Sequence, residues 1–480
     1  MPAALPARQD FLSGISGLTA DSRKVQPGWL FAALRGVKAD GQVFIRQALD
    51  QGAAAILTDT LPDAEAAQVR ARAQLILSDN PRRELAEIAA AFHGRQPRCI
   101  AVVTGTNGKT SVAEFTRQLW ALLGIEAASI GTLGMTLNSG RSKGALTTPD
   151  PVGLAEMLAG LAAQGMEHCA LEASSHGLDQ DRLSGVAASV GVFTSFSRDH
   201  LDYHKTPEAY LDAKLRLFRE RISPGQVAIV CADMPVSGQV EAVAREYELD
   251  LWTFGEKGER LALLAQEAVP GGQRLVLRVE GEAFTVTLPL VGSFQALNAL
   301  AALGVVLAFG AYRAQAVAAL EQLHGVDGRL QLIGTTAEGS AVFVDYAHTP
   351  DALKTALDAL RPAVQGRLLV VFGAGGDRDQ GKRPEMGAVA ARLADLVVVT
   401  DDNPRSEEPA GIRNAILAAC PGAKEIGDRA EAIAWAMGEL QEGDVLLIAG
   451  KGHETGQTIG GTVLPFDDRE QALKALGDRA

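Results

Sequence analysis

Cysteine is scarce in this sequence, and no apolar run is long enough to span a membrane. The four cysteines lie far apart without a Cys-x-x-Cys pair, which argues against a disulfide scaffold and favours reduced thiols in a cytoplasmic protein. The longest apolar run, residues 299–312, is shorter than the roughly 20 residues of a spanning helix and predicts a buried core helix. Residues Met1–Asp10 lack the basic start and apolar stretch of a secretory signal.

Positive charge is also in deficit, since 45 Lys and Arg face 58 Asp and Glu for a formal net charge of -13. An average field of this sign repels nucleic acid and anionic membranes, so we expect neither as a partner. Small anions can still bind in local positive pockets. A composition of 47% hydrophobic and 21% charged residues with 51 glycines is typical of a globular α/β protein.

At 480 residues the chain exceeds one ordinary hydrophobic core, and we expect three α/β domains. The first, residues 1–96, is small, and its helical patterns end near Phe92 before the turn-like Gly94–Pro97. Its expected strands lie within residues 30–34, 53–57 and 75–77.

The second and third domains, residues 97–330 and 331–480, alternate apolar strands with helical patterns, which predicts mostly parallel sheets. The strands expected in the second are 100–104, 168–172, 188–194 and 226–231. Those expected in the third are 341–345, 367–372, 396–400 and 444–449. We expect the third domain to be doubly wound, in the manner of a Rossmann fold.

A glycine-rich loop, Gly105-Thr106-Asn107-Gly108-Lys109-Thr110, stands between an expected strand and a helical pattern from Lys109 to Leu123. Glycines let backbone N–H groups approach anionic oxygens, Lys109 adds charge, and Thr110 can bind Mg²⁺, so the loop predicts a nucleotide phosphate site. The full signature needs a glycine where Val103 stands. An ordinary glycine turn is therefore the alternative.

Two polar clusters follow strands of the second domain. In Glu172–Gly177 a carboxylate at a strand end favours Mg²⁺ binding over a Ser-His nucleophile, because adjacent residues do not face each other and no G-x-S-x-G elbow is present. The alternative interpretation, in which a Ser caps a helix beside a structural Glu, stays open. In Ser197–His204, Leu201 stands where a zinc protease needs its glutamate, so Mg²⁺ coordination and substrate orientation are favoured for His200.

Four polar loops of the third domain also follow expected strands. They are 345–350, 373–378, 401–405 and 450–454. Arg378 stands where a dinucleotide fingerprint has its third glycine, which argues against an NAD enzyme. Mixed charges on neighbouring loops suit a zwitterionic ligand, because Arg grips carboxylates while Asp and Glu receive ammonium groups. A surface ion-pair network is the alternative.

These motifs in this order resemble the Mur ligase family over nearly the whole chain. The landmarks are Asp21-Ser22-Arg23, Gly105–Thr110, Thr147-Thr148-Pro149, Glu172–Gly177, Ser197–His204, Tyr210–Lys214, Asp345–Pro350, Gly375–Arg378, Asp402–Arg405 and Gly450–Glu454. The resemblance implies an N-terminal UDP-binding domain, a central P-loop ATPase-like domain and a C-terminal domain that brings in the amino acid. It implies an ATP-dependent amide ligase of cytoplasmic peptidoglycan precursor synthesis, and we expect a monomer whose third domain moves about a hinge near residue 330.

The resemblance also implies roles for single residues, with Lys109, Lys214 and His200 as the catalytic ones. Implied ATP contacts are Gly105, Thr106, Asn107, Gly108, Lys109, Thr110, Asn298, Arg329, Asp345 and His348. Implied contacts to the UDP-linked dipeptide are Ser22, Thr147, Thr148, Ser174, Gln180 and Arg182. Implied Mg²⁺ ligands are Thr110, Glu172 and His200, with Lys214 if it is carbamylated. Implied amino-acid contacts are Arg378, Asp402, Asn403, Pro404, Arg405, Gly450 and Glu454.

Within the family, the pattern Asp-Asn-Pro-Arg at Asp402–Arg405 is associated with meso-diaminopimelate, whose distal carboxylate Arg405 would bind. The implied substrates are then UDP-N-acetylmuramoyl-L-Ala-D-Glu and meso-diaminopimelate. The alternatives are the same reaction with L-lysine or another diamino acid, a folylpolyglutamate synthetase, and a P-loop ATPase or binding protein that forms no covalent product.

Lys214 lies in the helical stretch Pro207–Arg219, and related enzymes carbamylate the matching lysine to bind or position Mg²⁺. An unmodified lysine on a solvated helix face is the alternative. Three positions depart from the family pattern. They are Ser195 in place of Asn, Gln295 in place of the first Asn of the motif that ends at Asn298, and Asp327 in place of Pro.

Overall fold

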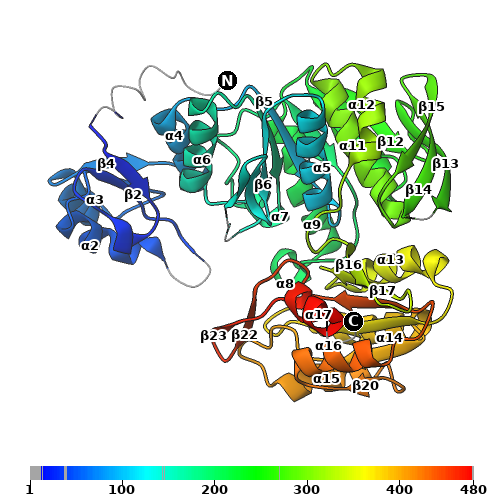
Figure 1. Ribbon diagram of the computed structural model, residues 1–480. Coiled ribbons are helices and arrows are strands. Elements are labelled where there is room, and N and C mark those ends of the chain that lie inside the picture. The colour runs from blue at the N-terminus through cyan, green and yellow to red at the C-terminus, as the bar shows by residue number, and fades with distance from the viewer. Residues whose placement is uncertain are drawn as a thin grey trace.

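The structure is a computed structural model that describes residue 12 and residues 14–36, 40–142, 144, 146–269 and 271–477. Met1–Asp10, for which the sequence predicts no secretory signal, lies outside these described residues. Three large sheets of four, eleven and six strands lie in succession along the chain, and Figure 1 shows them as separate bodies with helices packed against each. The expected α/β fold with three domains is confirmed. The boundaries at residues 96 and 330 stay a prediction.

The N-terminal sheet is wholly parallel, in the order β1-β2-β3-β4. Its strands are β1 (Gly17–Thr19), β2 (Trp29–Ala32), β3 (Ala55–Thr58) and β4 (Gln74–Leu77). Its helices are η1 (Ser22–Lys24), η2 (Gly41–Phe44), α2 (Ile45–Asp50), α3 (Asp63–Arg70) and α4 (Pro81–His93). Helix α4 begins with Pro81 after the Asn80 cap, and its Leu85 and Ile88 share a core with Ala155 of the next sheet unit. The first two units are thus joined by apolar packing.

The central sheet has the order β15-β14-β13-β12-β11-β10-β5-β9-β6-β7-β8. Its strands are β5 (Cys99–Thr104), β6 (Ala127–Gly131), β7 (Gly134–Leu137), β8 (Gly140–Ser142), β9 (His168–Glu172), β10 (Val190–Phe193), β11 (Val227–Cys231), β12 (Asp250–Gly255), β13 (Leu261–Val269), β14 (Gly272–Val279) and β15 (Glu282–Leu288). The strands from β13 to β6 pair in parallel, as expected, whereas both edges are antiparallel. The sequence analysis did not predict these edge strands, although β14 alternates buried Leu275 and Leu277 with exposed Arg274 and Arg278.

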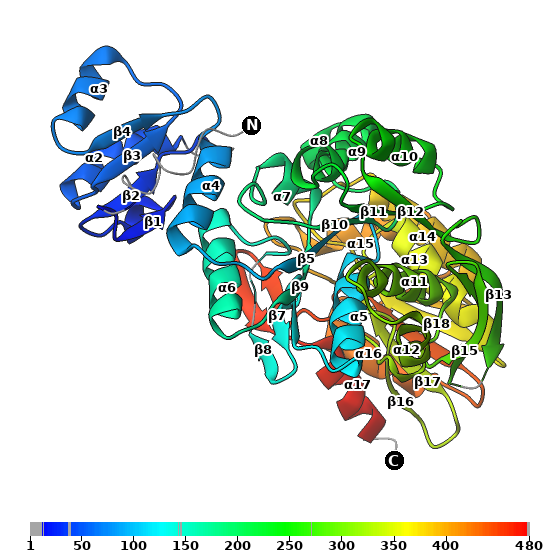
Figure 2. The same cartoon turned by 90° about the horizontal axis from the view of Figure 1, so that it is seen from above.

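Helices cover both faces of the central sheet. They are α5 (Lys109–Leu122), α6 (Pro151–Ala163), α7 (Ser175–Asp179), α8 (Leu201–His204), α9 (Pro207–Arg216), the π-helical turn η3 (Leu217–Arg221), α10 (Ser237–Glu246), α11 (Ser293–Ala308), α12 (Arg313–Ala319) and η4 (Leu320–Gln322). Helices α5 and α11 lie side by side in Figure 2 and pack against each other. Helix α11 is buried over most of its length, so the expected core helix is confirmed up to Ala308, whereas Tyr312 lies beyond the helix and is exposed. In the described part of the chain, no helix is long and apolar enough to cross a membrane.

The C-terminal sheet has the order β16-β17-β21-β18-β19-β20, parallel except for β16. Its strands are β16 (Gln331–Thr335), β17 (Ala341–Asp345), β18 (Leu368–Phe372), β19 (Leu396–Val399), β20 (Lys424–Glu425) and β21 (Val445–Ala449), beside a hairpin of β22 (Gly456–Ile459) and β23 (Thr462–Pro465). Its helices are α13 (Pro350–Leu360), η5 (Arg361–Ala363), α14 (Lys382–Leu393), α15 (Pro409–Leu417), α16 (Arg429–Gly438) and α17 (Asp468–Gly477). Leu368 and Val370 face one core while Leu369 and Val371 face another, as a doubly wound sheet requires.

A fully buried ion pair joins α16 and α17 to the end of β21. Two hydrogen bonds of 2.7 Å link the Arg429 guanidinium to Asp468, and Arg429 also donates to the carbonyl of Ala449 at 2.9 Å. Because Asp468→Asn leaves a buried guanidinium poorly paired, we expect it to lower the free energy of unfolding of this unit by about 3 kcal/mol. Urea-dependent hydrogen exchange of β18 and β21 measures this loss. Asp358→Asn breaks an exposed pair of the same unit, and an equal effect of both changes would contradict the prediction.

Candidate active site

The predicted polar motifs of the central sheet meet at one edge because three neighbouring parallel strands end there. Strand β5 lies between β10 and β9, so the glycine loop after Thr104, the carboxylate of Glu172 and the segment from Thr194 leave the sheet together. Open α/β sheets bind their ligands at this carboxyl edge. The three segments therefore form one site, although the first and the last are 90 residues apart in the sequence.

The glycine loop has a backbone that requires glycine at both ends. Gly105 and Gly108 have φ of 143° and 87°. A Cβ would lie 2.0 Å from Thr194 Oγ1 at the first and 2.6 Å from Asn298 Oδ1 at the second. Ser195, one of the departures from the family pattern, accepts from Thr106 N at 2.8 Å through its carbonyl and from Asn107 N at 2.9 Å through its hydroxyl. The loop is therefore held against Thr194, Ser195 and Asn298, which an ordinary glycine turn does not require.

Lys109 and the start of α5 complete the cradle. The Lys109 ammonium folds back over the loop and donates to the carbonyls of Gly105 at 3.0 Å and Thr106 at 2.8 Å. Burial lowers the pKa of Lys109, while the carboxylates of Glu172 and Asp199 act in the opposite direction. No side chain caps α5, so its N-terminal N–H groups and positive dipole end face the same space. The residues present fit a polyphosphate.

Glu172 is the buried carboxylate of the site, with 1% of its surface exposed. Its Oε2 accepts from the hydroxyls of Thr110 and Thr132 at 3.0 Å each, and its Oε1 accepts from Thr132 N at 2.8 Å. A Cβ on Gly131 would lie 2.0 Å from Oε1, so only glycine fits there. Thr132 is not among the predicted site residues, although Gly131-Thr132 directly after an apolar run indicates that a polar group follows that strand.

The donor set around Glu172 suits Mg²⁺. Its groups are carboxylate and hydroxyl oxygens, and among the described residues no three His, Cys, Asp or Glu side chains converge as a metal cage. Mg²⁺ is usually held by one or two protein oxygens together with waters and phosphate oxygens. Thr110 and Glu172 beside a phosphate cradle fit that requirement.

His200 lies beside this set in a cluster of aromatic rings. It begins α8 with a left-handed φ of 54°, and its Nε2 lies 3.4 Å from a carboxylate oxygen of Asp199. The ring of His176 is 4.9 Å away. Burial lowers the pKa of His200 to about 4, against the opposing charge of Asp199. The imidazole is therefore neutral near neutral pH and can act as a ligand or a hydrogen-bonding group.

Lys214 is buried, so the alternative of a lysine on a solvated helix face is wrong. Only 1% of the residue is exposed. Its Nζ donates to the carbonyl of Gly105 at 2.7 Å and lies 4.5 Å from the centre of the Tyr210 ring. Burial and the neighbouring Lys109 hold the pKa of Lys214 well below its usual value, against the charge of Asp199. Burial thus disfavours the charged form of the Lys214 amine, which lies directly behind the phosphate loop.

The residues predicted for the dipeptide meet around Thr148, except for Ser22. The Thr148 hydroxyl lies 3.2 Å from that of Ser174 and donates to the carbonyl of Glu172 at 2.9 Å. Arg182 donates to the Thr148 carbonyl and to Gln180, both at 2.8 Å. Ser174 also caps α7, as the capping alternative supposed. Thr147 contacts Thr132 at 3.0 Å, and Ser22 lies on the N-terminal unit in η1.

The predicted nucleotide contacts Arg329, Asp345 and His348 lie where the chain enters the C-terminal sheet. Arg329 donates to the Thr110 hydroxyl at 2.9 Å and stacks 4.6 Å over Tyr346. Asp345 accepts from Leu330 N at 2.6 Å, and burial raises the pKa of its carboxyl to about 6 against the charge of Arg329. His348 bonds through Nδ1 to the Tyr346 carbonyl at 2.8 Å.

The departure at Gln295 has a structural consequence. Its Oε1 accepts from Asn298 Nδ2 at 3.0 Å, while its own amide reaches the Arg329 carbonyl at 3.5 Å. Gln295 therefore orients Asn298, whose side chain closes over Gly108, and connects α11 to the segment that leads into the C-terminal sheet. Asp327, which replaces the Pro of the family pattern, forms ion pairs with Arg141 at 2.7 Å and with Arg469 at 3.5 Å.

The loop Asp402–Arg405 and Glu454 form a second cluster of polar groups at the carboxyl ends of the C-terminal strands. Asn403 donates to Glu454 Oε2 at 2.9 Å, and the fully buried Lys451 donates to the same oxygen at 3.0 Å. Arg405 donates to the Gly376 carbonyl at 2.8 Å. Because Asp402, Asn403 and Lys451 are buried, a surface ion-pair network does not describe this loop. Sequence analysis had assigned no role to Lys451.

Three further predicted amino-acid contacts, Gly450, Pro404 and Arg378, lie around Arg405 and Asp402. Gly450 has φ of 118°, and a Cβ there would lie 2.5 Å from Asp402 Oδ2. The Pro404 carbonyl lies where a Cβ on Gly376 would stand, at 1.9 Å. Arg378 is exposed, and a Cβ on Gly375 would lie 2.7 Å from Arg405 Nη1 and 3.8 Å from Arg378 Cγ. Two arginine side chains therefore lie close to one glycine.

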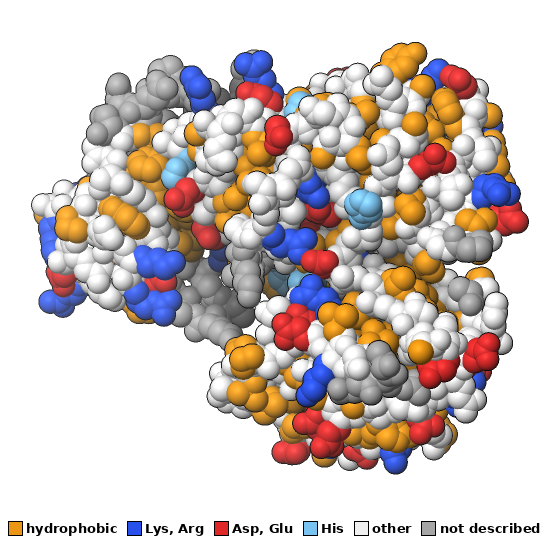
Figure 3. Space-filling view, in the orientation of Figure 1, with side chains coloured by type: hydrophobic (Ala, Val, Ile, Leu, Met, Phe, Trp, Pro, Cys, Tyr) orange, Lys and Arg blue, Asp and Glu red, His pale blue; other side chains and the backbone are white. Residues whose placement is uncertain are grey.

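The phosphate cradle and the second cluster belong to two bodies, central and C-terminal, that contact each other beside a hollow. Arg198 pairs with Asp379 at 3.4 Å and with Glu385 at 3.0 Å, and Asn107 donates to Asp351 at 3.2 Å. Figure 3 shows Lys, Arg, Asp, Glu and His side chains gathered along this hollow. Such a site can hold a polyphosphate on one wall and a zwitterion on the other.

Comparisons with known proteins match all three sheet units. The Mur ligase middle domain matches residues 103–306, the Mur ligase glutamate ligase domain matches 328–452, and the Mur ligase family catalytic domain matches 14–93. A UDP-N-acetylmuramoyl-L-alanyl-D-glutamate–2,6-diaminopimelate ligase of Rhizobium meliloti (strain 1021) is 50% identical over 96% of this chain and 94% of its own length. The ligase of the same name from Caulobacter vibrioides is 51% identical over 96% and 95%. A solved structure of a ligase of this name is 33% identical, with a TM-score of 0.70 over 97% of this chain and 95% of that one.

Proposed function

This chain belongs to the Mur ligase family of ATP-dependent ligases, and from that premise we propose that it joins meso-diaminopimelate to UDP-N-acetylmuramoyl-L-alanyl-D-glutamate. The reaction would supply a peptidoglycan precursor in the cytoplasm, where nucleotide-linked substrates are available. One observation supports this most: a phosphate cradle and a cluster of polar groups that suits a zwitterion lie on two bodies that contact each other. Neither a plain ATPase nor a binding protein needs the second cluster.

The first step activates the D-glutamyl side-chain carboxylate. One carboxylate oxygen attacks the γ-phosphorus of ATP, and the bond between this phosphorus and the β,γ-bridging oxygen breaks. The products are an acyl phosphate and ADP. Lys109, the start of α5 and Arg329 neutralise charge on the transferring group, which is what phosphoryl transfer chiefly requires. Mg²⁺ held by Thr110 and Glu172, with His200 beside it, would supply further positive charge.

The second step forms the amide. The amine of the amino acid attacks the acyl carbon, and phosphate leaves from the tetrahedral intermediate. Asn403 and Lys451 both donate to Oε2 of Glu454, and its other carboxylate oxygen would accept from an ammonium group of the amino acid. Arg405 and Arg378 lie close to Gly375, in the position to hold a carboxylate. Excluding water between the facing walls protects the acyl phosphate from hydrolysis.

Carbamylation of Lys214 belongs to this proposal. An uncharged amine is the form that attacks CO₂: the N–C bond forms, the nitrogen loses a proton, and the product is an anionic carbamate. The low pKa of Lys214, caused by its burial and by Lys109, favours that uncharged form. The carbamate would stand beside Gly105 and Lys109, where its charge can help to position Mg²⁺.

The test of the function is phosphate release with ATP, Mg²⁺ and UDP-N-acetylmuramoyl-L-Ala-D-Glu, with meso-diaminopimelate or L-lysine added in parallel and products identified by mass. We expect rapid release and a tripeptide with meso-diaminopimelate, and at most a slow residual rate with L-lysine. A rate with L-lysine that equals or exceeds the rate with meso-diaminopimelate would support the ligase activity but refute meso-diaminopimelate as the amino-acid substrate. Phosphate release without any tripeptide would favour a P-loop ATPase, and glutamylation of a folate would favour the synthetase.

Arg405→Ala should lower kcat/KM for meso-diaminopimelate by about 100-fold, because a paired guanidinium and carboxylate are lost together. Lysine lacks the distal carboxylate, so the residual rate with lysine should change much less. Steady-state kinetics with both amino acids measures the difference. Arg392→Ala, at an exposed position of α14, is the control. Equal losses for the two amino acids would refute the role of Arg405.

A further inference from the structure

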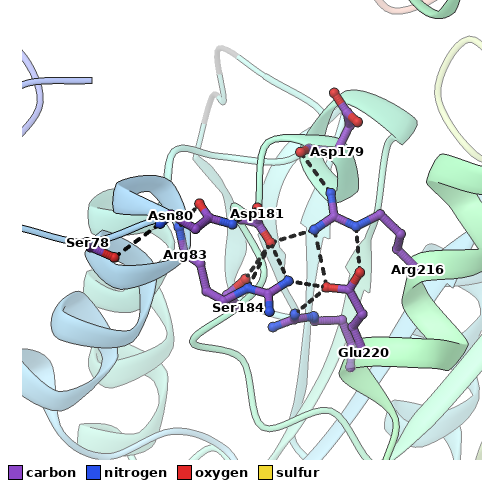
Figure 4. Close-up of polar contacts among 9 residues, drawn as sticks. Ser78, Asn80, Arg83, Asp179, Asp181, Ser184, Arg216 and Glu220 are labelled. Atoms are coloured by element: carbon purple, nitrogen blue, oxygen red, sulfur yellow. Dashed lines mark hydrogen bonds and ion pairs between the residues drawn. The ribbon is translucent and has the colours of Figure 1, made fainter. Parts of the chain in front are cut away.

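One buried carboxylate, that of Asp181, connects three segments of the chain (Figure 4). It is 6% exposed. It accepts from Asn80 Nδ2 at 3.0 Å, from the guanidinium of Arg83 at 3.3 Å, from Arg216 Nη2 at 2.7 Å and from the Ser184 hydroxyl at 3.2 Å. Asn80 and Arg83 open α4 of the N-terminal unit, and Arg216 ends α9. The N-terminal unit, α9 and the turn after α7 are thus held at a single point.

The backbone at Asp181 makes its side chain unusual. Helix α7 closes with hydrogen bonds from Asp181 N to the Leu178 carbonyl at 3.2 Å and from Arg182 N to the Gly177 carbonyl at 2.9 Å. This closing pattern places Asp181 in the left-handed region, with φ of 55°, where glycine is the usual residue. Aspartate tolerates that conformation less well than glycine does. The strain is offset by the bonds of the carboxylate, so the side chain has a use that glycine could not serve.

The residues on either side of Asp181 are two of the proposed dipeptide contacts. Arg182 donates to Gln180 Oε1 and to the Thr148 carbonyl, both at 2.8 Å, and Gln180 reaches the Tyr203 hydroxyl at 3.3 Å. Because both side chains leave the same closed turn, their directions follow from the position of Asp181. Fixing its carboxylate therefore fixes the pair.

The other end of the network reaches the helix of Lys214. Arg216 stands two residues further along α9 and also donates to the Asp179 carbonyl at 2.8 Å, at the end of α7. The π-helical turn η3 that follows brings Glu220 against Arg216 at 2.8 Å and against Arg83. Turns of this kind often mark functional segments. Asp181 and Glu220 therefore share two arginines, but only Asp181 belongs to the turn of the dipeptide site.

We propose that Asp181 is a positioning residue for the nucleotide-linked dipeptide. It holds Gln180 and Arg182 toward the substrate and ties them to the N-terminal unit and to the helix of Lys214, without touching the reacting atoms itself. This inference rests on the proposed function. It predicts that loss of the carboxylate weakens use of one substrate selectively.

Asp181→Asn tests the inference, because asparagine also tolerates the left-handed region and keeps the side-chain shape. We expect KM for UDP-N-acetylmuramoyl-L-Ala-D-Glu to rise about tenfold, as the loss of charge-assisted bonds suggests. KM for ATP and for meso-diaminopimelate should change by less than about twofold, since neither site contains the turn. Glu220→Gln is the matched control: it breaks ion pairs with the same arginines outside the turn, and the dipeptide KM should stay within about twofold.

Two results would overturn the inference: an unchanged dipeptide KM in Asp181→Asn, or an equal rise in Glu220→Gln. A parallel rise of all three KM values would do the same, because it indicates general loss of structure. If Asp181→Asn fails to fold, Arg83→Met serves instead, since Arg83 is partly exposed, and an unchanged dipeptide KM there refutes the inference. Failure of the wild-type protein to form tripeptide is distinct, because that result refutes the proposed function first.

Discussion

Replacing Lys109 by methionine should lower kcat for tripeptide formation by about a thousandfold. The change keeps the length and packing of the side chain but removes the ammonium group that folds over the phosphate loop, 3.0 Å from the Gly105 carbonyl. Charge that develops on the γ-phosphoryl group in the transition state then lacks its partner, and removal of one such donor typically costs ~10²–10³ in rate. The loss should exceed that from any exposed lysine.

Initial rates of phosphate release at saturating ATP measure this effect, since a change in nucleotide affinity alone would disappear there. KM for ATP should rise far less than kcat falls, because the loop backbone and the start of α5 still contact the phosphates. Lys354→Met, on the exposed side of α13, controls for the loss of a positive charge. A fall in kcat of less than about tenfold would refute the role of Lys109 in stabilising the transition state of phosphoryl transfer.

The site could be located from sequence because its motifs follow strands. Thr104, Glu172 and Thr194 end three expected strands, and the structure places these strands next to one another. In a parallel sheet the carboxyl ends share one edge, so strand-end polar residues must approach each other whatever the order of strands. The same reasoning placed Asp345 and the loop at Asp402 at one edge of the C-terminal sheet.

The partners within the site could not be predicted in the same way. Thr132 contacts Glu172 across 40 residues, and Asp181 meets Arg83 across 98. Such contacts depend on which strands become neighbours and on helix packing between units, and neither leaves a local periodicity. The burial of Lys214 was missed for a related reason. Its helix is polar on average, and only the position of α9 behind the phosphate loop removes that lysine from water.

Lys214→Met should abolish most activity, with kcat falling by about a thousandfold if the carbamate is the group that positions Mg²⁺. Wild-type enzyme freed of CO₂ should lose activity and regain it with bicarbonate, whereas Lys214→Met should respond to neither treatment. ¹³C-bicarbonate should give one carbamate carbon signal in the wild-type protein that is absent from Lys214→Met and retained in Lys474→Met, an exposed lysine of α17. If Lys214 gives no carbamate signal and the activity of the wild-type enzyme does not depend on CO₂, the carbamate is refuted. Lys214 would then be only a hydrogen-bond donor to Gly105.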